Sequence, residues 1–166
     1  MSDQGNAGGV LSTLSDELSG AVERAARYVV TVEARRQVAA SGILWPTGNG
    51  IVVTADHAVE REEGIVVRLP EGQKVGATLV GRDPGSDLAV LRLTNAGNLP
   101  APAELAPADA AKIGHLVLAI GRPGEGAPMA TFGIISALGG SWRTARGGIL
   151  ESYIRADVAL FSGFSG

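Results

Sequence analysis

The sequence has no cysteine, and aromatic residues make up only 4% of its 166 positions. Without cysteine, neither a disulfide framework nor a thiolate metal site can form within the chain. Lys and Arg do not cluster among aromatic residues, and the net charge of −3 provides no basic field for a phosphate backbone. We therefore expect no nucleic-acid partner.

Long apolar runs are also missing, since no stretch approaches the roughly eighteen residues of a membrane-spanning helix. The N-terminal segment lacks a basic region followed by an apolar run, so we predict neither a secretion signal nor a membrane segment in the sequence as written. The lack of cysteine fits a reducing cytoplasm, but many exported bacterial proteins lack cysteine too. The location stays unknown: cytoplasmic as written, or periplasmic or exported if a signal was removed.

Glycine, by contrast, is abundant. The chain contains 24 glycines, with 45% hydrophobic and 19% charged residues, which is typical of a globular protein. Many glycines combined with few aromatic residues favour short strands joined by tight turns over a helical bundle. The composition therefore predicts an all-β fold.

Hydrophobic periodicity divides the N-terminal part into three segments. Residues 1–12 are small and polar and are predicted to be a flexible N-terminus. Thr13 or Ser15 can cap a short amphipathic helix. The pattern then changes to alternation, which predicts a strand over 28–34 with Val30 and Val32 on one face.

Further strands are expected at short intervals, separated by turn signals such as PTGNG and PEG. They cover 41–45, 50–54, 64–69, 73–81 and 88–93. With the strand over 28–34 they make six, enough for one small barrel, so 13–93 is predicted to form the N-terminal helix and first barrel. The proline-containing stretch 94–111 is interpreted as a connector between barrels.

Residues 112–166 are predicted to form a second barrel. Strands are expected over 115–121, 129–139 and 149–160, with GRPGEGAP and GGSWRTARGG as the loops between them. A closed barrel of the same size needs about three more strands. The second barrel is therefore expected to be incomplete in these residues.

Hydrolysis by a serine nucleophile needs a hydroxyl, a histidine to accept its proton and a carboxylate to orient the imidazole. The chain has two histidines. His115 is interpreted as a residue without a catalytic role, whereas His57 directly follows a predicted strand that can aim it from a loop. Asp83 and Asp87 compete for the orienting role. Asp83 precedes a proline, which is typical of a turn, and Asp87 opens a predicted strand.

Five sequence blocks resemble, in order, the trypsin-fold serine endopeptidases of the HtrA/DegP type. They are SGILWPTGNG, IVVTADHAVE, GRDPGSDLAVLRL, LAIGRPGEGAPMATFGIISALGG and IRADVALFSGFSG, and the resemblance covers roughly residues 20–166. It implies two six-stranded antiparallel β-barrels of the trypsin fold with an N-terminal helix, the second barrel truncated after the nucleophile.

The resemblance also implies the site. His57, Asp87 and Ser165 would form the catalytic triad, in the chain order that distinguishes the chymotrypsin topology from the subtilisin and α/β-hydrolase orders. The backbone N–H groups of Gly163 and Ser165 would form the oxyanion hole. Phe164 stands where the family usually has asparagine, which leaves a backbone-built hole intact and changes the surroundings of the loop.

Ala159 and Leu160 correspond to the floor of the primary substrate pocket. An apolar floor without Asp or Glu argues against cleavage after Lys or Arg and favours small or medium aliphatic residues. The opposite wall of the pocket is expected beyond Gly166.

The leading hypothesis is a serine endopeptidase that needs no cofactor or metal and acts on unfolded or exposed protein segments in protein quality control. The resemblance implies polypeptide substrates and a homo-oligomer, a trimer, although the aromatic-rich N-terminus that would support it is missing. The alternative is a non-catalytic peptide-binding or chaperone-like module that keeps the trypsin fold. The incomplete second barrel and the phenylalanine residues around Ser165 favour this alternative, and the survival of all three triad residue types opposes it.

Overall fold

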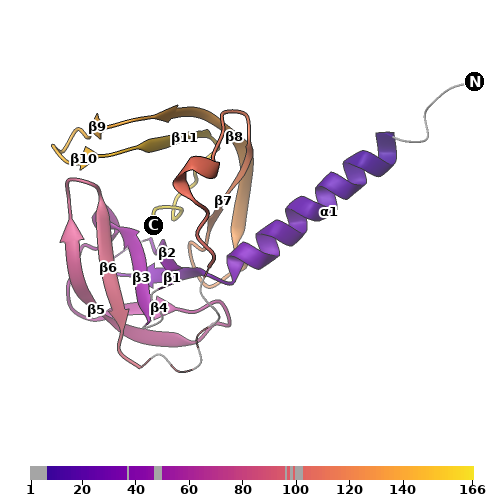
Figure 1. Ribbon diagram of the computed structural model, residues 1–166. Helices are drawn as coiled ribbons and strands as arrows, with labels where there is room; N and C mark the ends of the chain where they lie inside the picture. The colour runs from indigo at the N-terminus through magenta and orange to yellow at the C-terminus, as the bar shows by residue number, and fades with distance from the viewer. Residues whose placement is uncertain (1–6, 37, 47–49, 96, 98, 100–102) are drawn as a thin grey trace, which may run out of the picture.

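The computed structural model describes residues 7–36, 38–46, 50–95, 97, 99 and 103–166. Figure 1 shows a long helix leading into a closed barrel, followed by a smaller open sheet beside it, with the C-terminus between the two. The fold is mostly β with one N-terminal α-helix in the described residues, which confirms the predicted all-β class with an N-terminal helix.

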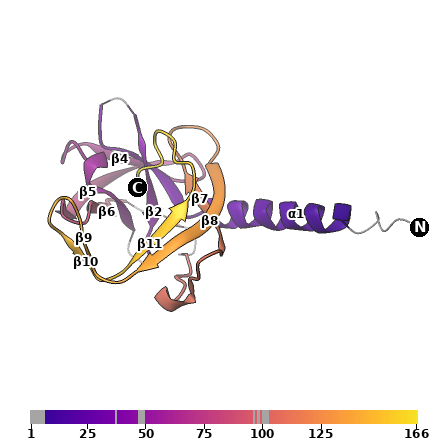
Figure 2. The same cartoon turned by 90° about the horizontal axis from the view of Figure 1, so that it is seen from above.

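Helix α1 (Ala7–Ala26) begins earlier than predicted, so residues 7–12, which were expected to precede the helix, are helical. Residues 1–6 lie outside the described part. Thr13 is not an N-cap: its hydroxyl lies within the helix and donates to the carbonyl of Gly9 at 2.8 Å. The early start of α1 is not explained by tertiary packing, because the helix projects away from the body (Figure 2) and Val10 and Leu11 are exposed.

The first six strands close into an antiparallel barrel in the order β1-β2-β3-β6-β5-β4. They are β1 (Val29–Glu33), β2 (Ala40–Leu44), β3 (Ile51–Ala55), β4 (Ile65–Arg68), β5 (Lys74–Asp83) and β6 (Leu88–Leu93). Each corresponds to a predicted strand, with ends displaced by no more than two residues. The six-stranded barrel of the predicted fold class is confirmed.

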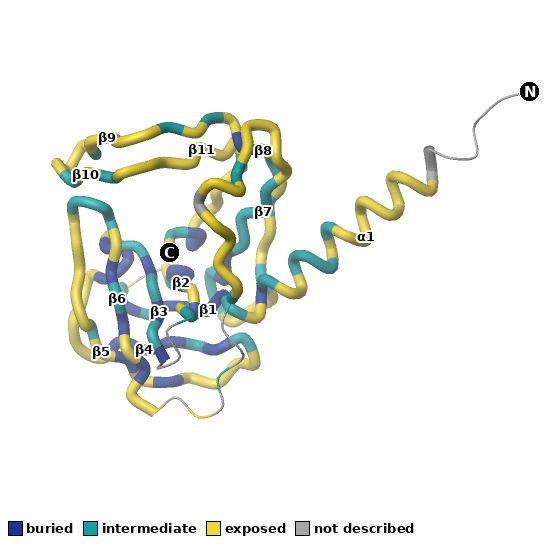
Figure 3. Tube along the Cα trace, in the orientation of Figure 1, coloured by how far each residue is buried: buried dark blue, intermediate teal, exposed yellow. Residues whose placement is uncertain are grey.

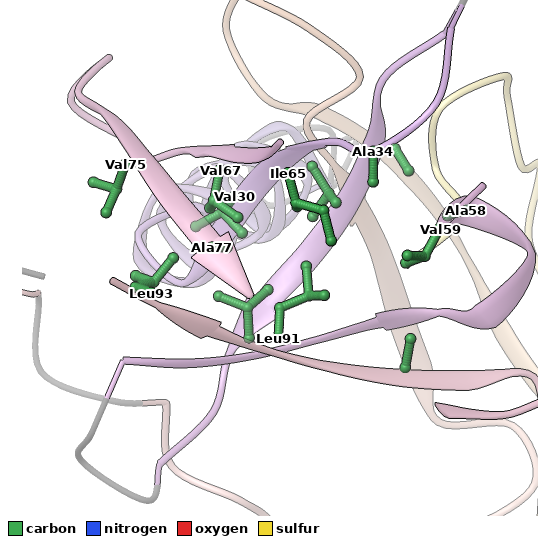
Figure 4. Packing of buried hydrophobic residues seen from close by; sticks show 14 of the residues in the cluster. Val30, Ala34, Ala58, Val59, Ile65, Val67, Val75, Ala77, Leu91 and Leu93 are labelled. Atoms are coloured by element: carbon green, nitrogen blue, oxygen red, sulfur yellow. The ribbon is translucent and has the colours of Figure 1, made fainter. Parts of the chain in front are cut away.

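The barrel core is formed by the alternate apolar residues of these strands (Figure 4). Val30, Val67 and Leu91 are completely buried there. Burying each such side chain contributes about 1.5–3 kcal/mol. This makes the barrel the rigid part of the molecule from which a loop residue can be aimed.

The second half is an open sheet in the order β11-β8-β7, with a separate hairpin. Its strands are β7 (Leu116–Gly121), β8 (Met129–Gly139), β9 (Trp142–Arg143), β10 (Ile149–Leu150) and β11 (Tyr153–Asp157). The single strand predicted over 149–160 is therefore wrong, because it is divided into β10 and β11. Part of the predicted loop GGSWRTARGG is β9, which pairs with β10. Figure 3 shows that the sheet β11-β8-β7 is largely exposed, consistent with an incomplete second barrel.

The two halves meet at the outer face of β1, where the buried hydroxyl of Thr31 shares its one proton between the carbonyls of Arg122 (2.9 Å) and Gly124 (3.0 Å). The guanidinium of Arg122 is itself buried and donates to the carbonyls of Ala26 (3.1 Å) and Val29 (3.0 Å). Burial lowers the pKa of Arg122, which nevertheless stays charged. Arg122 thus joins the end of α1 and the start of β1 to the second half.

Candidate active site

His57 stands on a short turn that the barrel holds in place. β3 runs into the 3-10 turn η1 (Asp56–Ala58), in which the N–H of Val59 donates to the carbonyl of Asp56 at 3.0 Å. The side chain of Asp56 is buried and pairs with Arg82 at 2.5 Å. With Ala58 and Val59 also buried, the exposed imidazole of His57 projects from an anchored backbone.

Asp87 binds His57 twice. Its Oδ2 lies 2.7 Å from His57 Nδ1, and its Oδ1 accepts the backbone N–H of His57 at 3.0 Å. The antiparallel pairing of β3 with β6 sets this approach, because Ala55, the last residue of β3, lies opposite Leu88, the first residue of β6. A carboxylate can only accept, so Nδ1 carries the proton and Nε2 of the neutral ring is left as an acceptor.

Asp87 has a φ of 59°, in the left-handed region that non-glycine residues rarely adopt. Its backbone carbonyl accepts the N–H of Asp56 at 3.0 Å, so hydrogen bonds hold both its main chain and its side chain. Strain of this kind persists where the surroundings fix the backbone, and it is frequent at functional sites.

The pKa of Asp87 is lowered from its ordinary value. Desolvation raises it, but the two hydrogen bonds from His57, the electrostatic attraction of His57 and the positive charge of Arg146 together outweigh that effect. The competing Asp83 has a different role in the structure: its carboxylate accepts the N–H groups of Gly85 (2.9 Å) and Ser86 (3.2 Å) and closes a turn.

Arg146 lies in the loop between β9 and β10, and no sequence motif points to it. Its guanidinium lies 3.5 Å from Asp87 Oδ1 and 3.9 Å from Asp56 Oδ2. The hairpin loop is docked on the 83–87 turn, since Thr144 Oγ1 donates to the carbonyl of Gly85 at 2.7 Å. A loop of the second half thereby places a positive charge beside the His57–Asp87 pair.

Replacing Arg146 with Gln should raise the pKa of Asp87 toward its ordinary value. A carboxyl with a lowered pKa stabilises the fold above about pH 4, and this contribution is lost as the pH falls through the lowered pKa. The variant should therefore unfold more easily than wild type at pH 7, and the difference should disappear in acid. Urea unfolding at several pH values, with NMR titration of the Asp87 carboxyl, measures both effects.

Arg143→Gln is the matched control, because Arg143 is an exposed arginine of the same hairpin that donates to Gly147 and pairs with no described carboxylate. It should leave the Asp87 titration unchanged. An equal shift in both variants would mean that the hairpin conformation, and not the Arg146 charge, acts on Asp87.

Ser165 lies in the segment that follows β11. The N–H of Phe164 donates to the carbonyl of Phe161 at 3.1 Å, which closes a turn, and Gly163 has a φ of 87° at its third position. A Cβ on Gly163 would lie 2.2 Å from Cβ of Pro123, so only glycine fits. Phe164 is buried against Gly121 and holds the turn to the body by apolar packing.

No described residue accepts a hydrogen bond from the backbone N–H of Gly163 or of Ser165. These two N–H groups are the predicted oxyanion-hole donors. Unpaired donors beside a nucleophile have the chemistry that such a hole needs, because they can bind a developing negative charge.

One cleft of about 490 Å³ brings the predicted triad residues together. His57, Asp87 and Ser165 all line it, and its apolar lining includes Leu160, Phe161 and Phe164. His57 and Ser165, both within the described chain, do not hydrogen-bond to each other. Such bonds are often long in ligand-free enzymes.

The other predicted site residues lie as follows. Leu160 is exposed and lines the cleft. Ala159 is outside the cleft lining, and its carbonyl accepts the hydroxyl of Thr131 at 2.8 Å. His115 is exposed directly before β7, where Nδ1 accepts the N–H of Lys112 at 3.3 Å, and it does not line the cleft.

Within the residues that the structure describes, no group of three His, Asp or Glu side chains is placed to hold a metal ion. No helix in that part of the chain combines the length and the apolar character needed to cross a membrane.

Comparisons with known proteins identify the family. A model of the trypsin-like peptidase domain matches residues 40–166. The chain is 39% identical over 126 residues to the periplasmic serine endoprotease DegP of Escherichia coli (strain K12), covering 76% of this chain and 26% of DegP. This chain belongs to the trypsin-like peptidase family. Within that family it is of the HtrA/DegP type, as the five sequence blocks indicated.

Other trypsin-like peptidases support the assignment. The periplasmic pH-dependent serine endoprotease DegQ of Escherichia coli (strain K12) is 34% identical over 126 residues, which cover 76% of this chain and 27% of DegQ. The crystal structure of Deg5 superposes with a TM-score of 0.76 at 26% identity, covering 92% of this chain and 78% of Deg5. The chain spans about a quarter of the length of the curated relatives DegP and DegQ.

Proposed function

We propose that this protein is a serine endopeptidase that hydrolyses peptide bonds in unfolded or exposed protein segments. Ser165 is the nucleophile, His57 the general base and Asp87 the residue that orients His57. The observation that carries the proposal is the double hydrogen bond between His57 and Asp87, on the same cleft as Ser165.

The reaction proceeds in two steps. His57 Nε2 takes the hydroxyl proton as Ser165 Oγ attacks the scissile carbonyl, and the N–H groups of Gly163 and Ser165 stabilise the oxyanion. The proton then passes from Nε2 to the leaving amine, which gives an acyl-enzyme on Ser165. A water molecule, deprotonated by Nε2, then attacks the ester. Nε2 returns that proton to Ser165 Oγ as the ester bond breaks and the new carboxyl end of the substrate is released.

Substrate preference follows from the apolar lining of the cleft. Leu160 is exposed there beside Phe161 and Phe164, and no acidic residue other than Asp87 lines the cleft among the described residues. Small or medium aliphatic side chains are the proposed preference, with unfolded polypeptides as the substrate class and protein quality control as the role. A periplasmic location is proposed from the names of DegP and DegQ, and a homo-trimer from the family resemblance.

The alternative function is a non-catalytic peptide-binding module, and the missing hydrogen bond between His57 and Ser165 is the observation that favours it. A fluorophosphonate probe separates the two functions, because it reacts only with a serine whose proton is accepted by a base. The intact protein should label, and mass spectrometry of the digested product should place the label on Ser165.

Ser162 supplies the control, since it is an exposed serine of the same loop. Ser162→Ala should label at the wild-type rate. Failure of the folded wild-type protein to label, or a label on Ser162, would refute the proposed mechanism and support the binding module.

A further inference from the structure

Ser41, in β2, contacts the nucleophile loop, defined here as residues 161–166, through both its main chain and its side chain. Its backbone N–H donates to the carbonyl of Ser165 at 2.8 Å. Its hydroxyl donates to the carbonyl of Gly163 at 2.7 Å. The residue is only 2% exposed, so both hydrogen bonds are shielded from water.

The direction of the Ser41 hydroxyl is fixed by its neighbours. A hydroxyl has one proton to donate, and the backbone N–H of Arg122 donates to Ser41 Oγ at 2.8 Å. Because Arg122 occupies the acceptor side, the proton of Ser41 is directed to Gly163. The guanidinium of Arg122 in turn binds the carbonyls of Ala26 and Val29, which anchors the donor to the first half of the molecule.

The main chain of Ser41 is also fixed by a hydrogen bond within the barrel. Its carbonyl accepts the hydroxyl of Thr54 at 2.7 Å, and Thr54 belongs to β3, the strand that leads to His57. Ser41 therefore touches the nucleophile loop on one side and the strand before the histidine on the other. This connection crosses the boundary between the two halves.

The two loop carbonyls that Ser41 holds lie on either side of the Ser165 N–H along the chain. Fixing the carbonyl groups of Gly163 and Ser165 fixes the planes of the peptide groups that follow each residue. The peptide group between them carries the N–H of Ser165, a proposed oxyanion donor. The nucleophile and its donor are thus set by contacts with a residue that does not reach the substrate cleft.

We propose that Ser41 is a positioning residue that holds the nucleophile loop in the conformation required for catalysis, with Arg122 directing its hydroxyl. This inference rests on the proposed function and adds a residue to it. Displacing reacting groups by about 1 Å can cost roughly 100-fold in rate, so loss of the hydroxyl should act on turnover more than on substrate binding.

The test compares Ser41→Ala with Thr31→Val in the intact protein. Both variants remove a buried hydroxyl that bridges the two halves, but the Thr31 proton is shared between the carbonyls of Arg122 and Gly124 and does not reach the nucleophile loop. The Arg122 N–H that directs Ser41 belongs to the preceding peptide group, which Thr31 does not contact. Ser41→Ala should lower kcat, and the rate of fluorophosphonate labelling, roughly 10- to 100-fold with KM within about threefold. Thr31→Val should lose comparable stability in urea and keep kcat within about twofold of wild type.

Hydrogen exchange of the Phe164 amide gives a readout that is independent of activity. It should become at least about tenfold faster in Ser41→Ala than in Thr31→Val, because the loop is released in the first variant alone. If Ser41→Ala does not fold, Thr54→Val, which frees the Ser41 carbonyl, should show the same exchange and kcat changes in weaker form.

Failure of the Ser41 inference can be distinguished from failure of the proposed protease function. A wild-type protein that does not label refutes the proposed function, and the exchange measurement then decides the positioning role alone. Equal changes in kcat, or equal exchange of Phe164, in Ser41→Ala and Thr31→Val would overturn the inference, because both hydroxyls would then be merely structural.

Discussion

Ser165→Ala should reduce kcat for the hydrolysis of unfolded casein by about 10⁶-fold. The methyl group cannot attack the scissile carbonyl, and no other described serine lies on the cleft with His57. KM should change little, because the apolar lining formed by Leu160, Phe161 and Phe164 is kept. Initial rates of casein cleavage at saturating substrate measure the effect.

Ser162→Ala is the matched control for this experiment. It makes the same chemical change three positions earlier, at an exposed serine that lies outside the cleft lining. Its kcat should stay within about twofold of wild type, as for most surface substitutions. Residual hydrolysis above about 1% of the wild-type rate in Ser165→Ala, or a large loss of kcat in Ser162→Ala, would contradict the assignment of Ser165 as the nucleophile.

The barrel was the most predictable part of the molecule from sequence. Residues such as Ile65 and Val67, or Ala89 and Leu91, alternate with more exposed residues, and this period of two is a local property of the chain. The strand ends and the division of 149–160 into β10 and β11 were not predictable in the same way. They depend on pairing with Trp142 and Arg143, which lie in a segment that reads as a loop.

The first residue of helix α1 was also not predictable from the sequence, for a different reason. Thr13 is a good N-cap type followed by an apolar stripe, but glycines at positions 8 and 9 do not stop the helix from extending to Ala7. Glycine disfavours helix interiors by only about 1 kcal/mol, which neighbouring good helix formers can offset. Local propensity therefore predicted the helix and misplaced its first residue.

The residues of the candidate site also differ in how well the sequence predicts them. His57, Asp87 and Ser165 sit in blocks with a recognisable order, so sequence could nominate them. Arg146 and Ser41 could not be nominated, because an exposed loop arginine and a strand serine carry no signal of their own. Each acts through a contact between the two halves, over a separation in sequence of 59 residues for Arg146 and Asp87 and of more than a hundred for Ser41 and Gly163.

Asp87→Asn should lower kcat by about 10⁴-fold while leaving the protein folded. The amide keeps an oxygen that can accept the backbone N–H of His57, and asparagine tolerates the left-handed φ of 59° better than most residues. The NH₂ group, however, would face Nδ1 as a donor and favour the tautomer with the proton on Nε2, which cannot then accept the proton of Ser165.

Asp83→Asn tests the assignment, because Asp83 was the competing aspartate in the sequence. It lies in the same loop, and its carboxylate binds Gly85 and Ser86 and not a histidine. This variant should lose stability and keep kcat near the wild-type value. Steady-state kinetics and urea unfolding of both variants separate the two effects. Both variants should lose some stability, because Asp87→Asn also removes the carboxylate that faces Arg146. A large fall in kcat confined to Asp87→Asn would assign the orienting role to Asp87, whereas a larger fall in Asp83→Asn would show that Asp83 has that role.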